Sequence, residues 1–491
     1  MNRNMYVLCK NIVVRVLSAA LMTIVFILVG CSPVGPDYTE SEKAVSLNWH
    51  TQLGGGFVSE EMKPEVLASW WTTLNDMKLS SLVNRAVAGN LDLKQAQSRI
   101  VEARARRGIA KADLFPTLNF SGSDTWTRTS QATGTGKTTE LYSASFDSGW
   151  EIDIFGGVRR SIEASDADLQ ASQEDLHDVL VSLIGEVALN YVEVRTYQAR
   201  LAAVNENIKA QNETYQLIQW RSEAGLSDEL TLQQALYNLE SSRSEIPALQ
   251  TGLEASMNRI AVLLGEAPGK VHEELENSAP IPVSSPQIAV GVPAEMIRRR
   301  PDIRMAEREL AAQTARVGVA AADLYPKFSL SGSIGVEAAL FSKFKTNTGD
   351  SNNWILNGGP GVSWAIFDGG AIRQNIKVQS ALQEQALLQY ESSILSAIEE
   401  VENALVSYAN EQNRMDSLSK AAEAARKAIE LAKQEYEAGL IDFSNVLDAQ
   451  RSLLSFEDQL AQSKGTVTSN LISVYKALGG GWTPLGTEGK N

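Results

Sequence analysis

The chain has 491 residues, a formal net charge of −15 at pH 7, and 44% hydrophobic residues. This composition excludes wholesale disorder, and the length allows several domains or one elongated domain. The acidic balance argues against nucleic acid as the main partner, because phosphate binding needs a cationic surface. Both cysteines, Cys9 and Cys31, lie near the N-terminus. The body of the chain therefore has no disulfide framework and no cysteine metal site.

The first thirty residues are predicted to be a signal peptide. Basic residues precede a mostly apolar run, Val16 to Gly30, which is too short for a membrane-spanning helix. The run ends in LVGC, which resembles the lipobox of bacterial lipoproteins. In that motif, cleavage before the cysteine leaves a lipid-modified N-terminus. We therefore expect Cys31 to be lipidated and to be the only cysteine of the mature chain. An ordinary signal peptide with an accidental cysteine is the alternative.

The chain contains two copies of one pattern. ADLFPTLNFSGS begins at Ala112 and ADLYPKFSLSGS begins at Ala322, an offset of 210 (322 − 112), and seven of the twelve positions match. LDLKQAQSRI and EAGLSDELTLQQA in the first half likewise match PDIRMAEREL and EAGLIDFSNVLDA in the second. Each half is predicted to run helix, strand, strand, long helix, tight turn and helix. A solenoid is unsuitable, because it needs at least three short repeats.

Four segments alternate between apolar and polar residues, as strands with one apolar face do. They are residues 118–127, Tyr142–Ile154, Phe328–Val336 and the weaker, glycine-rich Trp354–Ile366. Soluble sandwiches also alternate, but strands of about ten residues with aromatic ends are typical of transmembrane barrels. No apolar run after Cys31 is long enough for a membrane helix. Because the smallest barrels have eight strands, four strands need several copies to close, and three copies give twelve.

Long helices are predicted on both sides of the strands. Ala371–Ala438 holds no glycine or proline over 68 residues (438 − 371 + 1), about 100 Å of helix. The matching segment, Val158–Ala224, is interrupted only by Gly185. Both end in EAGL, where glycine suits a left-handed helix cap. A long coiled coil without a channel explains these helices equally well, but it does not explain the strands.

The sequence resembles the TolC-like outer membrane efflux channels, specifically the OprM/NodT-type lipoproteins that serve RND multidrug pumps. The segments that carry the resemblance are LVGC, SWW at Ser69–Trp71, the RRRPDIR segment within Val292–Pro326, IFDGG at Ile366–Gly370, and Tyr436–Ser455. The resemblance implies a mixed α+β membrane channel built as a homotrimer. Four strands per chain would form a trimeric twelve-stranded outer-membrane β-barrel, continued by a long periplasmic α-helical barrel.

The repeat and the resemblance together divide the chain into six predicted parts. They are a signal peptide (1–30), a lipidated N-terminal and equatorial segment (31–78), a first repeat (79–265), an equatorial linker (266–292), a second repeat (293–479) and a C-terminal tail (480–491). The linker is rich in proline and serine, as an irregular connection should be.

The resemblance also implies the function, a passive conduit in the outer membrane. It would carry drugs or other small molecules exported by an RND-type pump through a periplasmic adaptor. The three histidines are too scattered for a metal motif, and GTGKT at Gly134 lacks the first glycine of a phosphate-binding loop. We therefore expect no enzyme activity, cofactor or metal. A structural or adhesive lipoprotein, a type I secretion channel and a soluble enzyme remain alternatives.

A periplasmic gate is predicted near the second tight turn. Ile441, Asn445 and Asp448 are spaced as on one helical face, and the resemblance adds Tyr436 and an acidic ring at the Asp448 position. The first repeat has Gln234 at the equivalent place, so three chains would supply three carboxylates. A solvated helix face is the alternative.

Two further groups of candidate residues follow from the pattern. The helical tips expose apolar residues at turns, which often marks a partner site, and the resemblance assigns them to adaptor docking: Gly225, Leu226, Gly439 and Leu440. Asp147, Glu151 and Asp153 are expected on the water-facing side of a strand. They predict an acidic lumen with a mild preference for cations.

Overall fold

The computed structural model describes residues 33–39, 49–51, 56–58, 63–283, 288–289, 293, 299–339, 341 and 353–482. The predicted signal peptide, Cys31 and the tail beyond 482 lie outside these residues. The chain forms two compact units, and both repeats contribute to each. Unit 1 comprises Met1–Glu42, Arg99–Ser172 and Met305–Tyr390, and unit 2 comprises Lys43–Ser98, Gln173–Arg304 and Glu391–Asn491.

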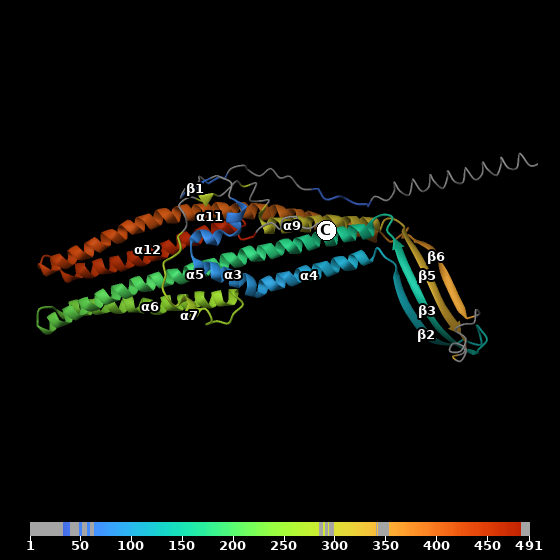
Figure 1. Ribbon diagram of the computed structural model, residues 1–491, viewed down its shortest axis with the longest axis horizontal. Coiled ribbons are helices and arrows are strands. Elements are labelled where there is room, and N and C mark those ends of the chain that lie inside the picture. The colour runs from blue at the N-terminus through green and yellow to red at the C-terminus, as the bar shows by residue number, and fades with distance from the viewer. Residues whose placement is uncertain are drawn as a thin grey trace, which may run out of the picture. The chain divides into compact units, whose positions relative to one another are not determined.

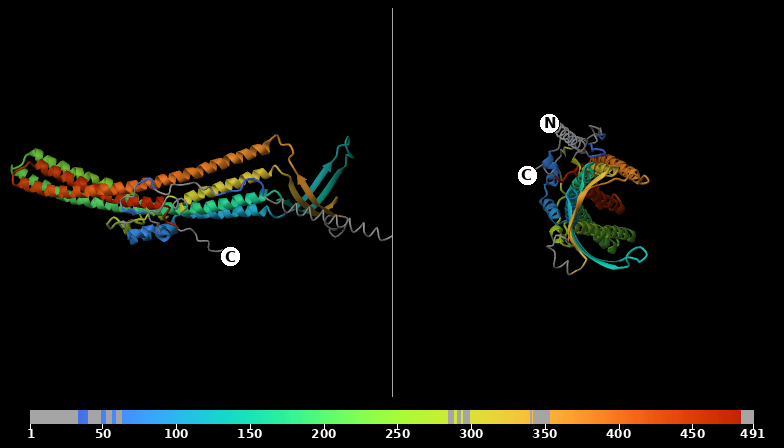
Figure 2. Two further views of the ribbon diagram at one scale, coloured as in Figure 1. Left: turned by 90° about the horizontal axis from the view of Figure 1, so that it is seen from above. Right: turned by 90° about the vertical axis from the view of Figure 1, so that its right-hand side faces the viewer.

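Unit 1 contains a four-stranded antiparallel sheet of order β2-β3-β5-β6 (Figure 1). Its strands are β2 (Thr117–Arg128), β3 (Thr138–Ile152), β5 (Lys327–Ala338) and β6 (Trp354–Ser363). All four predicted strands are therefore confirmed. The pairing of β3 with β5 joins the two repeats, and Figure 2 shows that the sheet is curved.

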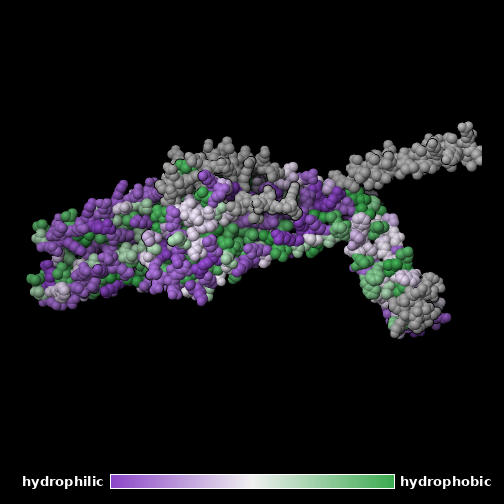
Figure 3. Space-filling view, in the orientation of Figure 1, coloured by the Kyte–Doolittle hydropathy of each residue, from purple (hydrophilic) through white to green (hydrophobic). Residues whose placement is uncertain are grey.

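The register of the sheet gathers apolar side chains on one face. Phe146 lies between Phe120 and Ile334 on the neighbouring strands, and the rings of Phe120 and Phe146 are 5.3 Å apart. The glycine-rich strand β6 joins the same face, because its pairs are Val362 with Phe328, Pro360 with Leu330, Leu356 with Ile334 and Trp354 with Val336. Apolar residues accordingly gather along the sheet in Figure 3.

The same turn connects helix to strand in both repeats. Helix α4 (Leu91–Ala112) leads into β2, and α9 (Pro301–Ala322) leads into β5. The indole Nε1 of Trp150 donates to the carbonyl of Leu114 at 2.9 Å, and that of Trp364 donates to the carbonyl of Leu324 at 3.0 Å. Leu114 and Leu324 each lie two residues beyond the end of the helix, in the turn that leads to the strand. Each tryptophan thus ties a strand to the helix end beside it.

The helices repeat with equal lengths. Helices α5 (Gly157–Glu223) and α11 (Ala371–Glu437) have 67 residues each, and α6 (Glu229–Leu263) and α12 (Phe443–Ala477) have 35 each. The internal duplication is therefore confirmed. Among the described helices, none is long and apolar enough to cross a membrane.

The remaining short elements lie in unit 2. They are β1 (Phe57–Val58), α2 (Pro64–Ala68), the 3-10 helix η1 (Trp70–Leu74), α3 (Met77–Gly89), α7 (His272–Leu275) and β4 (Ile288–Ala289), with β1 parallel to β4. Trp70 is buried and stacks on Tyr475 of α12. Arg300 of the RRRPDIR segment binds both oxygens of Asp302 and donates to the carbonyl of Ala477 at 2.8 Å. These contacts join the start of α9 to the end of α12.

The tryptophan contacts at the helix-to-strand turns can be tested one at a time. Trp150→Phe and Trp364→Phe each keep an aromatic ring and remove one N–H donor. We expect each change to destabilise the protein by about 1 kcal/mol, the usual net worth of one hydrogen bond, measured as a lower midpoint of unfolding. Trp354→Phe, at the far end of β6, is the matched control and should leave the midpoint unchanged. Equal effects at all three positions would contradict the proposed role of the indole N–H.

Candidate functional site

The polar face of the sheet carries a ladder of hydroxyl groups. Asp147 accepts hydrogen bonds from the hydroxyls of Ser121 at 2.7 Å and Ser145 at 3.0 Å. The hydroxyls of Ser123 and Ser143 lie 2.8 Å apart. Glu151 is on the same face as Asp147, opposite a serine of β5. This face can exchange hydrogen bonds with water or polar solutes, and its side chains include two of the three predicted acidic residues.

Asp153 has a different role from the one predicted. Strand β3 ends at Ile152, and the Asp153 carboxylate accepts from the backbone N–H groups of Val158 at 3.1 Å and Arg159 at 2.9 Å. The Arg159 side chain also approaches it, at 3.2 Å. These contacts satisfy free N–H groups at the start of α5. The prediction of Asp153 as a strand residue on the water-facing side was wrong, because the apolar Ile154 continued the alternation beyond the strand end.

The helical tips are two matching turns in unit 2. Gly225 has φ 72° and Gly439 has φ 73°, the left-handed conformation that glycine adopts without a steric penalty. The N–H groups of Leu226 and Leu440 close the turns by donating to carbonyls five residues earlier, at 2.7 and 2.9 Å. The predicted helix caps are confirmed. Leu226 and Leu440 are 69% and 74% exposed, so each tip presents an apolar side chain.

The two tips differ in how the following helix begins. Asp228 caps α6 by accepting from the backbone N–H of Thr231 at 2.8 Å. The Thr231 side chain and backbone donors lower the pKa of Asp228 below its usual value. The equivalent residue, Asp442, makes no such side-chain cap for α12.

The two helical hairpins pack against each other beside the tips. One buried cluster combines residues of α5 and α6 with residues of α11 and α12: Ile218, Ala235, Ile429, Phe443, Val446 and Leu447. Tyr436 is partly buried against this cluster, with its ring 5.1 Å from that of Phe443. The guanidinium of Arg221 lies 5.3 Å from the Tyr436 ring. In one chain, Tyr436 therefore packs between the hairpins.

The candidate gate residue Asp448 is exposed and paired within its own helix. Its carboxylate lies 3.0 Å from Arg451, with 68% of the side chain exposed. Arg451 also donates to the hydroxyl of Tyr237 on α6 at 3.1 Å, which links the two hairpins. The Asp448–Arg451 spacing could have been noticed in the sequence, whereas the contact with Tyr237 could not, because 214 residues separate the two.

The other two predicted gate residues differ in placement. Asn445 is exposed in the first turn of α12, and its amide donates to the carbonyl of Asp442 at 3.1 Å. Ile441 lies before α12, which begins at Phe443. The predicted face was therefore wrong at Ile441, because the helix had been assumed to start earlier than its true N-terminus.

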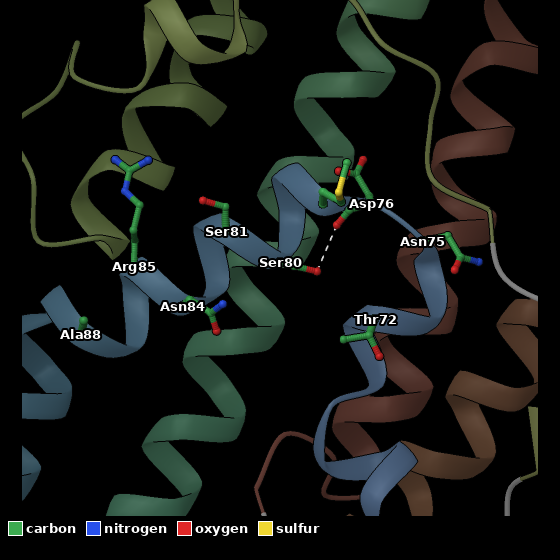
Figure 4. A pocket seen from close by; sticks show the side chains of 9 residues that line it. Thr72, Asn75, Asp76, Ser80, Ser81, Asn84, Arg85 and Ala88 are labelled. Carbon is green, nitrogen blue, oxygen red and sulfur yellow. Dashed lines mark hydrogen bonds between the residues drawn. The ribbon is translucent and has the colours of Figure 1, made fainter.

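A groove of about 760 Å³ runs beside α3 in unit 2 (Figure 4). The two charged residues that line the groove already have hydrogen-bond partners within the protein. Asp76 caps α3 and accepts from the Tyr191 hydroxyl at 2.7 Å, and Arg85 binds Glu266 and Glu274. The Ser80 hydroxyl donates to the backbone carbonyl of Asp76. The groove supplies no paired nucleophile and base, and the described residues hold no group of three or more potential metal ligands.

Comparison with known proteins identifies the family of these helices and strands. The model of the family described as outer membrane efflux protein matches residues 82–266 and 292–480. The chain belongs to the outer membrane efflux protein family. The two matched segments correspond to its two repeats, and the family assignment makes the chain an efflux channel with no enzymatic activity. The predicted family, the two-repeat fold and the channel function are confirmed.

Individual relatives of this efflux protein cover almost the whole chain. Nodulation protein T of Rhizobium leguminosarum bv. trifolii is 33% identical, over 94% of this chain and 97% of the relative. The solvent efflux pump outer membrane protein SrpC of Pseudomonas putida is 29% identical, over 94% and 98%. The solved structure of the outer-membrane channel OprN is 36% identical and matches with a TM-score of 0.85, over 92% of this chain and all of that one.

Two substitutions test whether Asp448 faces the conducted ions. Asp448→Ala removes the carboxylate, whereas Arg451→Ala leaves it without its counterion. We expect the two variants to shift the reversal potential, measured in planar bilayers under a salt gradient, in opposite directions. The Arg451→Ala channel should be more cation-selective than the unmodified channel. Because exposed ion pairs are worth at most about 1 kcal/mol, stability should change little. The double variant is the control and should lie between the two single variants, because it keeps the net charge of the unmodified pair. Unchanged potentials in both single variants would contradict the gate assignment.

Proposed function

We propose that three copies of this efflux protein close one barrel in the outer membrane and form the exit duct of an RND efflux system. The observation that supports this proposal is the sheet of unit 1, which has one apolar face and two open edges. Within the described residues, β2 and β6 each pair on one side only. Hydrocarbon does not tolerate unpaired strand edges, and four strands are too few for a barrel. Three copies supply the twelve strands of the predicted fold.

The partners and the membrane anchor belong to the same proposal. The lipobox supports lipidation of Cys31, so that acyl chains hold the protein in the outer membrane while its helices stand in the periplasm. The likeness to the outer membrane protein of a solvent efflux pump supports a pump as partner. The resemblance given in the sequence analysis adds the RND type of that inner membrane pump and a periplasmic adaptor. Drugs or other small molecules would be the cargo. The proposed domain limits remain those given by the repeat and the resemblance.

The polar face of the sheet favours a conduit over the competing roles. A structural or adhesive lipoprotein needs no continuous row of hydroxyl and carboxylate groups on the inner side of the sheet. Asp147 and Glu151 would make that inner surface acidic, whereas Asp153 contributes less because Arg159 pairs with it. A type I secretion channel would use the same sheet, but the lipobox favours the RND branch.

The gate and the tips complete the proposed channel. The exposed carboxylate of Asp448, with Asn445 in the first turn of the same helix, would ring the periplasmic aperture. Three carboxylates repel one another, by about 0.7 kcal/mol for a bare pair 6 Å apart in water, and the Arg451 beside each one reduces this repulsion without supplying a closing force. The closing force must therefore come from packing, such as that of Tyr436 on Phe443. Leu226 and Leu440, exposed beside Gly225 and Gly439, would contact the adaptor.

The barrel proposal can be tested by placing the same charge on each of the two opposite faces of strand β5. Ile334→Arg places a charge on the apolar face, at a cost of about 2–4 kcal/mol in the middle of a bilayer. Ser331→Arg places the same charge on the polar face. We expect the first variant to lose most of the membrane-inserted trimer, measured by the mass of the complex after mild detergent extraction. The second should keep it. A complex smaller than three chains in the unmodified protein would contradict the proposal.

Adaptor docking can be tested at the two exposed leucines. Leu226→Asp and Leu440→Asp introduce charge without altering the left-handed glycines, whose replacement would add backbone strain. We expect each variant to weaken co-purification with the adaptor and to reduce efflux at least tenfold when combined, because apolar interface anchors often contribute 1–2 kcal/mol or more. Leu226→Met and Leu440→Met keep an apolar tip and should behave as the unmodified protein. Full efflux in the double Asp variant would exclude docking at these tips.

A further inference from the structure

The interior of the two helical hairpins is apolar at two levels along their length. The hairpins, α5–α6 and α11–α12, lie side by side in unit 2 (Figure 1). We call the buried cluster around Phe443, beside the tips, the tip cluster. A second buried cluster joins Val204 of α5, Leu249 of α6 and Leu454 of α12, and we call it the shaft cluster. The residues between these two levels decide whether the apolar packing is continuous.

Three buried amide side chains occupy positions between the two clusters. On α5, Gln211 lies seven residues from Val204 of the shaft cluster and seven from Ile218 of the tip cluster (211 − 204 and 218 − 211). Residues seven apart share one face of a helix. On α6 and α12, Asn238 and Gln450 likewise lie between residues of the two clusters. None of the three amides is more than 4% exposed. We call them the amide layer.

Most polar atoms of the amide layer have no hydrogen-bond partner among the residues that the structure describes. Both side-chain polar atoms of Gln211 and of Asn238 are buried without one, and so is Oε1 of Gln450. Only Nε2 of Gln450 is engaged, donating to the hydroxyl of Thr214 on α5 at 3.0 Å. Burying a polar group without a partner costs free energy, because its bonds to water are lost and not replaced. The amide layer therefore weakens the packing between the two clusters.

The next buried amide of α5 is bonded instead. Asn207 donates to the carboxylate of Glu457 on α12 and to the carbonyl of Ala203, both at 3.0 Å. Arg426 of α11 donates to the same carboxylate at 2.6 Å. This amide thus belongs to a network that joins three helices at the level of the shaft. The shaft is held by hydrogen bonds that the amide layer lacks.

The second repeat does not bury amides at the equivalent positions. The tip glycines are 214 positions apart (439 − 225), so Gln211 corresponds to Ala425 and Asn238 to Ser452. Ala425 is buried, whereas Ser452 is exposed. The repeated pattern of the helices therefore does not require buried amides at this level.

We propose that the amide layer separates the tip of the two hairpins from the shaft, so that the tip opens as a unit of its own. When the tip opens as far as the layer, Gln211 and Asn238 return to water and recover their hydration. Opening that continued further would have to break the shaft cluster and the bonds of Asn207. Local opening ends where its free energy rises. The amide layer is therefore the boundary of the opening unit.

The consequence for the gate rests on the proposed function, whereas the boundary itself does not. The tip contains Tyr436 and Phe443 of the tip cluster and the exposed carboxylate of Asp448. With these residues at the aperture, the tip can rearrange while the shaft stays packed. Continuous apolar packing would resist the same movement, because opening would expose apolar side chains and recover no hydration of buried amides.

The boundary can be measured by hydrogen exchange of the backbone amides, followed by mass spectrometry of the detergent-solubilised protein. Peptides around Phe443 should exchange at least tenfold faster than peptides around Leu454. Fraying near a turn would give the same difference, so a variant decides. Gln211→Met combined with Asn238→Leu keeps the side chains similar in shape and removes their unpaired polar atoms. It should slow exchange in the tip about tenfold, because opening no longer recovers the hydration of two amides.

Asn207→Leu is the matched control, because it makes the same chemical change at an amide that has partners. It should speed exchange around Leu454, since Glu457 loses a donor. Unchanged or faster tip exchange in the double variant would overturn the proposal, and so would slower exchange in Asn207→Leu. Where the double variant fails to fold, Gln211→Met and Asn238→Leu carry the test singly, each with a smaller slowing.

Single-channel recording in planar bilayers tests the link to the gate. The double variant should be open for a smaller fraction of the time than the unmodified protein, and an equal fraction together with slowed exchange would contradict that link. A protein without any conductance would contradict the proposed channel instead. The exchange rates would still decide the boundary, since they are measured without conduction.

Discussion

Backbone groups that enter hydrocarbon need hydrogen-bond partners, and this requirement governs the rest of the structure. A single chain supplies four strands, and the edge strands β2 and β6 each keep one side unpaired among the described residues. The proposed trimer meets the requirement by joining three copies of the chain. The duplication serves this need, because each repeat contributes one hairpin of strands followed by one long helical hairpin. The helices of the two hairpins also match in length, with 67 and 35 residues in each repeat.

The differences between the repeats are as informative as their agreement. The helix-to-strand turns agree down to one hydrogen bond, since Trp150 and Trp364 both bind a leucine carbonyl. The tips agree in their glycine caps but differ in charge, because Asp448 with Arg451 has Gln234 as its counterpart in the first repeat. Two equivalent glycines also differ, because a Cβ added to Gly318 would lie 2.9 Å from the Arg160 side chain, whereas one added to Gly108 would meet no atom within 4 Å. The two repeats thus diverge at the proposed gate and at the Gly318 position of α9.

Short-range patterns predicted the helices and strands well but misplaced some of their ends. Alternation of period two fixed the apolar face of β3, and that face continues unchanged through Phe120, Phe146 and Ile334. Alternation does not show where a strand stops, so Asp153 was placed in the sheet although it caps α5. Ile441 was placed on α12 for a similar reason, because helical spacing does not show where the first turn begins. In both cases the deciding contacts are made by the backbone of the next element.

The sequence by itself determined the duplication, the four strands, the long helices, their glycine caps and the family. Each of these depends on residues close together in the chain or on a motif repeated along it. Only the tertiary structure decided that Arg451 meets Tyr237, that Tyr436 packs on Phe443, and that Arg160 donates to Asp37 and to the carbonyl of Val34. The physical reason is that the Tyr237 and Arg160 contacts join residues more than 100 positions apart. The packing of Tyr436 depends on how the two hairpins meet. No local periodicity records those arrangements.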